Sequence, residues 1–132
     1  MKQYDDAIKV YKIGHKYYND SNNCSVVAVS ICTGKAYGTA LNTLAKLGRR
    51  IRQGAYPSMI MKAIELHGFN LIPYKLAKYG TVSTITKKLP SKGKFLIFVS
   101  GHVLTVRDGK VMDWTEGRRH RIRSVYQVVK DN

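Results

Sequence analysis

Residues 101–114 read GHVLTVRDGKVMDW, and this stretch decides the predicted fold. At its centre stands Asp108-Gly109, a dipeptide typical of two-residue hairpin turns, which lies between two apolar runs. A two-residue turn would place Leu104 opposite Asp113. The stretch therefore predicts two antiparallel strands whose register is fixed by the turn.

This register brings a histidine and an acid together on one face of the hairpin. Side chains alternate along a strand, so His102 and Leu104 share a face. Asp113, opposite Leu104, lies on that face and is diagonal to His102. Diagonal neighbours lie about 7–8 Å apart between backbones, within reach of a carboxylate–imidazole hydrogen bond. One additional loop residue would move Asp113 to the other face, so the prediction depends on a tight turn.

Outside the hairpin, the sequence predicts helices first and an antiparallel sheet second. Apolar runs indicate strands at 69–74, 95–99 and 121–129. Helical spacing indicates helices at 24–32, at 36–47, after Pro57 and, for one short segment, at 81–89, while residues 1–16 form an N-terminal arm or helix. This order predicts an α+β fold in a single domain, 1–132, with N-terminal helices packed on a C-terminal antiparallel sheet.

Cys24 stands where the polar loop 19–23 meets the predicted helix. The run that follows is rich in β-branched residues, so propensity alone would also allow a strand, but Gly34 is a typical helix stop. The dipole at a helix N-terminus stabilises the thiolate form of a cysteine. With Cys24 as nucleophile, His102 as base and Asp113 as the group that orients the base, the three roles of a catalytic triad are filled.

These segments resemble the papain-like cysteine peptidase superfamily. Residues 19–29, NDSNNCSVVAV, resemble the loop and helix around its nucleophile, and residues 100–106 and 111–114 resemble its histidine and acid strands, in the same order along the chain. The likeness extends to small bacteriophage members and to bacteriocin-processing peptidase domains. It implies a papain-like fold and a phage-encoded cysteine hydrolase (a peptidase, isopeptidase or amidase) that acts on a protein or peptide.

The same resemblance directs attention to the residues that would stabilise an oxyanion. The superfamily commonly places a glutamine shortly before the cysteine, and this chain has Tyr18 there. The resemblance therefore implies Asn19 as the side-chain donor, with Asn22 or Asn23 as alternatives and the backbone N–H of Cys24 as the second donor. Loss of such a donor lowers the rate of acyl transfer by about 10²–10³-fold.

The charge balance raises a second hypothesis. Lys and Arg total 23 against 8 acidic residues, a net charge of +15. Such a field attracts polyanions. Cations gather at Arg49 and Arg50 and again at Arg118, Arg119 and Arg121, which could bind an anionic partner, although a solvated loop is the simpler interpretation. The alternative function is a catalytically weak papain-like scaffold that acts as a basic binding protein for nucleic acid or an acidic host protein.

Other classes of function find little support in the sequence. The four histidines are scattered and the two cysteines do not form a CxxC pair, so no metal is expected, and Cys24 and Cys32 are expected to be free thiols. No glycine-rich nucleotide loop is present, so no cofactor is expected. No apolar run approaches the ~20 residues that span a bilayer, and no signal core follows Met1. We therefore expect no membrane association and a cytoplasmic location, the host cytoplasm if the chain is phage-encoded.

Overall fold

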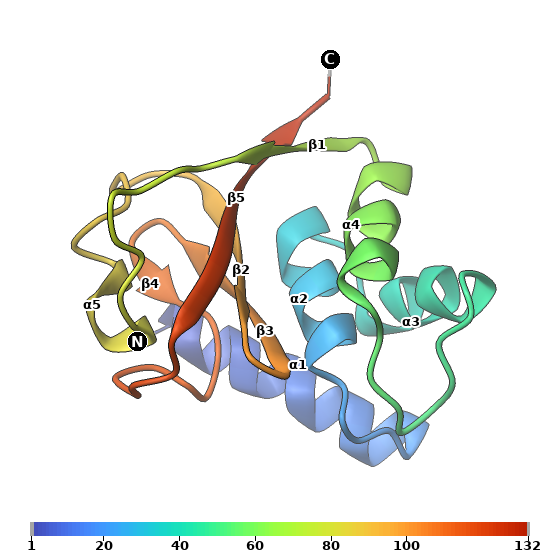
Figure 1. The fold of residues 1–132 in the computed structure, drawn as a ribbon. Helices are drawn as coiled ribbons and strands as arrows, with labels where there is room; N and C mark the ends of the chain where they lie inside the picture. Colours follow the sequence, from blue (N-terminus) through green and yellow to red (C-terminus); the bar gives the residue numbers. More distant parts are fainter. Residues whose placement is uncertain (1, 132) are drawn as a thin grey trace.

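The computed structural model describes residues 2–131, and their side chains from residue 7 onward. Its helices are α1 (Lys2–Tyr18), α2 (Cys24–Thr33), α3 (Tyr37–Lys46), α4 (Pro57–Leu66) and α5 (Val82–Ile85). Its strands are β1 (Phe69–Pro73), β2 (Lys94–Val99), β3 (His102–Arg107), β4 (Lys110–Val111) and β5 (Ile122–Lys130). The predicted α+β class, with helices packed on an antiparallel sheet, is confirmed (Figure 1).

The sheet has the order β1-β5-β2-β3-β4, and every neighbouring pair is antiparallel. Helices α2, α3 and α4 lie on one side of it and α5 lies on the other (Figure 1). Alternation along β2 supplies both interfaces: Leu96 and Phe98 belong to the core shared with the helices, whereas Phe95 and Ile97 belong to the core beneath α5. The sheet is therefore buried on both faces.

The hairpin that the sequence predicted is present with the predicted register. Arg107 pairs with Lys110, and the N–H of Met112 donates to the carbonyl of Thr105 at 2.8 Å. The second strand is shorter than predicted, because the chain turns at Asp113, whose carbonyl accepts the N–H of Glu116 at 3.3 Å. The tight turn that the alignment of His102 with Asp113 required is thus in place.

Helix α2 is the central helix of the fold. It packs against β3 on one side and against α3 and α4 on the other, so its residues from Ser25 to Thr33 are all buried. Burial on every face explains why β-branched residues prevail in a helix, since packing overrides propensity. The helix ends as predicted at Gly34, which adopts the left-handed conformation with φ 71°. The first residue of this helix is Cys24.

The N-terminal segment, for which the sequence left an arm and a helix open, is the helix α1. It contacts α2, α3 and the end of the hairpin at β4, and it runs across the base of the view in Figure 1. Gly14 allows this close approach, because a Cβ there would lie 2.5 Å from the hydroxyl of Tyr37 and 2.6 Å from the amide nitrogen of Asn23. The helix is therefore docked against the loop that precedes Cys24.

Two predicted elements are shorter in the structure. The segment 81–89 forms one helical turn, α5, followed by turns up to Leu89, because only Val82, Ile85 and Leu89 face the core. Strand β1 ends at Pro73, one residue earlier than predicted.

Within residues 2–131, no single helix combines the length and the apolarity needed to cross a membrane. Helices α2 and α3 have the required length and apolarity only when they are taken together, and the chain bends by 115° between them.

Candidate active site

The loop 19–23 that delivers Cys24 to the start of α2 is anchored by a buried ion pair. Arg49 donates two hydrogen bonds of 3.0 Å to the carboxylate of Asp20, and both side chains are fully buried. The hydroxyl of Tyr37 and the backbone N–H of Arg52 donate to the same carboxylate at 2.6 and 2.7 Å. Burial alone would raise the pKa of Asp20, but these donors, Arg49 foremost, lower it below its usual value.

This anchor corrects the role predicted for Arg49. The sequence grouped Arg49 with Arg50 as a site for an anionic partner, but the guanidinium of Arg49 forms a buried ion pair with Asp20. A buried arginine with a bidentate partner is not available to an external anion. Arg50, in contrast, is exposed.

The predicted pair of His102 and Asp113 meets in the structure. The Nε2 atom of His102 lies 2.8 Å from a carboxylate oxygen of Asp113, which is 1% exposed. The backbone N–H and the hydroxyl of Thr115 donate to that same oxygen at 3.2 and 2.7 Å. The carboxylate is therefore held in one orientation, and Nδ1 is the ring nitrogen of His102 left for another partner.

Cys24 lies beside this ring. The two residues line the same two cavities, and the presence of the thiol raises the pKa of His102. Burial would lower the pKa of His102, but the hydrogen bond to Asp113 and then the contact with Cys24 raise it, together with the charges of both groups, to about 9. The imidazole therefore carries a proton at neutral pH, in position to pair with a thiolate and to protonate a leaving group.

Tyr11 of α1 belongs to the same network. Its hydroxyl donates to the second carboxylate oxygen of Asp113, and burial together with the charge of Asp113 raises the pKa of Tyr11 well above its usual value. The sequence analysis did not single out this residue. Tyr11 and Asp113 are 102 positions apart, and no local pattern connects a helix position with a carboxylate at the far end of the chain.

Aromatic rings cover one side of the histidine. The ring centroids of Trp114 and His102 lie 4.9 Å apart, and those of Trp114 and His120 lie 5.6 Å apart. The guanidinium of Arg118 lies 5.6 Å over the Trp114 ring. The side chains of His102 and Asp113 are 10% and 1% exposed, so the hydrogen bond between them is largely removed from bulk water, which strengthens it.

Two cavities of about 410 Å³ each adjoin the sulfur of Cys24. Both are lined by Asn22, Cys24, Gly101 and His102, so the reactive pair stands at the boundary between them. The first cavity is completed by Ile8, Tyr11, His15, Asn23 and Trp114. The second extends between α4 and the sheet over a largely apolar surface that includes Ile60, Met61, Phe98, Val103 and Tyr126. A substrate could thus extend to both sides of Cys24.

The asparagine predicted as the oxyanion donor does not line either cavity. Asn19 is exposed, and its backbone carbonyl accepts a hydrogen bond of 3.2 Å from Arg52. Asn22 lines both cavities, and it has the positive φ of 53° that turns the loop into α2. Asn23 is buried and donates to the hydroxyl of Tyr37 at 3.1 Å. The geometry therefore favours Asn22 as the oxyanion donor, because Asn22 lines both cavities beside Cys24 and Asn19 lines neither.

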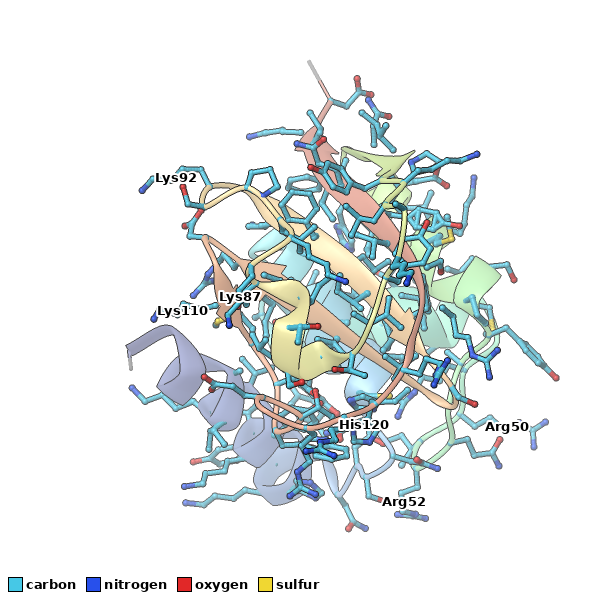
Figure 2. The ribbon with its side chains drawn as sticks, turned by 60° about the vertical axis from the view of Figure 1, so that its left-hand side comes forward. Arg50, Arg52, Lys87, Lys92, Lys110 and His120 are labelled. Carbon is cyan, nitrogen blue, oxygen red and sulfur yellow. The ribbon has the colours of Figure 1, made fainter. Side chains whose placement is uncertain are left out.

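The remaining predicted anion-binding arginines are exposed. Arg118, Arg119 and Arg121 follow Trp114 in the loop that leads into β5. Figure 2 shows Arg50 at the lower right and Lys92 and Lys110 on the opposite side of the view. Labelled cations therefore lie on opposite sides of the molecule in this view (Figure 2).

Comparisons with protein-family models, with curated proteins and with solved structures found no match to this chain.

Proposed function

We propose that this chain is a cysteine hydrolase of the papain-like type, acting on the carbonyl of a peptide, isopeptide or related amide. One observation carries the proposal: Cys24, at the start of the central helix, lines the same two cavities as His102, whose Nε2 atom lies 2.8 Å from the buried Asp113. Nucleophile, base and orienting acid are then linked in series, in a cleft open on both sides of the sulfur.

In the proposed reaction, the thiolate of Cys24 attacks the substrate carbonyl carbon and forms a tetrahedral oxyanion. The backbone N–H of Cys24 and the side-chain amide of Asn22 would stabilise that charge. Protonated His102 gives its proton to the leaving amine, and an acyl thioester remains on the sulfur. His102, now neutral, removes a proton from water, which attacks the thioester and restores the thiolate and the imidazolium. Asp113 keeps the ring oriented in both steps.

The arrangement of the elements supports the papain-like assignment. The nucleophile begins a helix buried against an antiparallel sheet, and the histidine and the acid come from the neighbouring β3 and the turn after β4. The order of cysteine, histidine and acid along the chain is that of the superfamily which the sequence resembles. A protein or peptide substrate follows from this assignment.

Turnover of p-nitrophenyl acetate at Cys24 tests the proposal, because it needs a reactive thiolate and a base for deacylation but no specific peptide. The expected result is release of more than one equivalent of nitrophenolate per protein and an acetylated intermediate located at Cys24. Cys24→Ala is expected to abolish both. Cys32→Ala is the matched control, since Cys32 is fully buried and burial raises its pKa to about 11.

Acetylation that persists in Cys24→Ala, or that resides on Cys32, would refute the proposal. A folded wild-type protein that never acetylates would refute it too. In that event the alternative function would remain, a basic binding protein for nucleic acid or an acidic protein, which the net charge of +15 supports.

A further inference from the structure

Strand β5 contains a β-bulge at the edge of the apolar cavity. Against β2, Phe98 pairs with Ser124, but the next residue, Val99, pairs with Ile122. Arg123 is therefore the extra residue, with no partner of its own across the ladder. A bulge of this kind redirects side chains and is common beside functional sites.

The bulge changes the face of the sheet on which successive residues of β5 lie. Ile122 and Val125 both lie in the core beneath α5, although strict alternation would separate them. Between them, Arg123 and Ser124 both line the cavity on the helix side of the sheet, as does Tyr126. The bulge thus places Arg123 at the cavity, whereas regular pairing of β5 would place it on the opposite face of the sheet.

Arg123 is the only arginine or lysine that lines this cavity, and no aspartate or glutamate lines it among the described residues. The cavity wall is otherwise mostly apolar, with Ile60, Met61 and Phe98 among its residues. Within residues 7–131 no carboxylate forms an ion pair with Arg123. Arg123 is exposed and lines this apolar cavity without an internal counter-ion, so its guanidinium is available to a carboxylate, to which it can donate two parallel hydrogen bonds.

We propose that this cavity is a substrate subsite for an apolar side chain with a carboxylate next to it, and that Arg123 selects the carboxylate. The inference rests on the proposed function and adds a substrate class to it: acidic peptides, with the apolar residue and the acidic residue adjacent on one side of the reacting bond. Charge complementarity supports this class, because the two cavities beside Cys24 contain no aspartate or glutamate in the described residues.

The experiment measures the rate at which Cys24 is alkylated by three chloroacetamides, which need only a reactive sulfur. Each probe carries a phenylalanine followed by glutamate, glutamine or lysine, so that only the charge next to the apolar ring changes. Iodoacetamide serves as a small uncharged reference. We expect wild-type protein to react with the glutamate probe about fivefold faster than with the glutamine probe, the effect of one partly exposed ion pair, and slowest with the lysine probe.

Two variants separate the local effect from the general positive field. Arg123→Gln is expected to remove the preference for glutamate while leaving the iodoacetamide rate unchanged. Arg121→Gln lowers the net charge equally, and Arg121 is exposed like Arg123 and lies two residues earlier, but it lines neither cavity beside Cys24. It should keep the preference.

The outcomes distinguish this inference from the proposed function. Equal rates for the three probes in a wild-type protein that iodoacetamide labels at Cys24 would overturn the inference alone. A preference that Arg121→Gln and Arg123→Gln reduce equally would also overturn it, because the field and not the subsite would then be responsible. Absence of any labelling at Cys24 would contradict both the inference and the proposed function.

Discussion

The hydroxyl of Tyr11 offers a direct test of the network behind Cys24. Asp113 accepts hydrogen bonds from Tyr11, from Thr115 and from His102. Tyr11→Phe removes one donor and keeps the ring that lines the first cavity. Because a donor stabilises the charged carboxylate and weakens it as an acceptor for its other partners, its removal should strengthen the interaction between Asp113 and protonated His102.

The size of the effect follows from the contacts. A hydrogen bond to a charged acceptor contributes about 1.5–3 kcal/mol. If about half of the lower value is transferred to the imidazolium, His102 gains roughly 0.7 kcal/mol, which corresponds to about half a pKa unit. The pKa of His102 should therefore rise from about 9 toward a higher value, rather than fall.

The assay is an NMR titration of the Cε1–H signal of His102, assigned by its absence in His102→Gln. The wild-type midpoint is expected near pH 9, and the Tyr11→Phe midpoint higher by about half a unit. Tyr17→Phe is the matched control, since Tyr17 lies on the same helix with 69% of its surface exposed, and it should not move the midpoint. A midpoint that stays constant or falls in folded Tyr11→Phe would refute the reasoning.

Two further predictions concern the loop before Cys24. Asp20→Asn leaves the buried guanidinium of Arg49 without its counter-ion and should lower the free energy of unfolding, measured in urea, by about 3 kcal/mol; a loss below about 1 kcal/mol, the range of an exposed pair, would contradict a structural role for this anchor. Asn22→Ala should slow acetylation by p-nitrophenyl acetate by about 10²-fold and leave alkylation by iodoacetamide unchanged, because alkylation forms no oxyanion. Equal losses in both reactions would argue against Asn22 as the oxyanion donor, and Asn19→Ala should affect neither.

The parts of the site that the sequence predicted are those set by local rules. The turn at Asp108-Gly109 fixes a register, and the register alone brings Asp113 beside His102. Gly34 and the polar loop mark the ends of α2, so the position of Cys24 at a helix start was also accessible. Turn geometry, strand alternation and helix termini act within about ten residues, and for that reason they can be read from a single sequence.

The parts that were missed depend on contacts between distant segments. Arg49 looked like one of many surface cations, but its partner Asp20 lies 29 residues away and only tertiary packing makes it a buried anchor. The bulge at Arg123 arises from pairing with β2, and the sequence of β5 alone shows a regular strand. The sequence could not choose between Asn19 and Asn22, because both are asparagines at positive φ and only the folded loop shows that Asn22 lines the cavities beside Cys24.

Helix α1 is the element whose importance changes most between sequence and structure. From the sequence it is a weakly patterned arm or helix, yet Tyr11 donates a hydrogen bond to Asp113, and Ile8 and His15 line the first cavity. Gly14 permits the helix to contact the loop before Cys24, so the same helix touches both ends of the triad. Removing α1 should therefore be unlike removing a tail: it would expose the carboxylate, open one of the two cavities and release the loop. The site is better described as formed between α1, α2 and the hairpin than as a triad on a sheet.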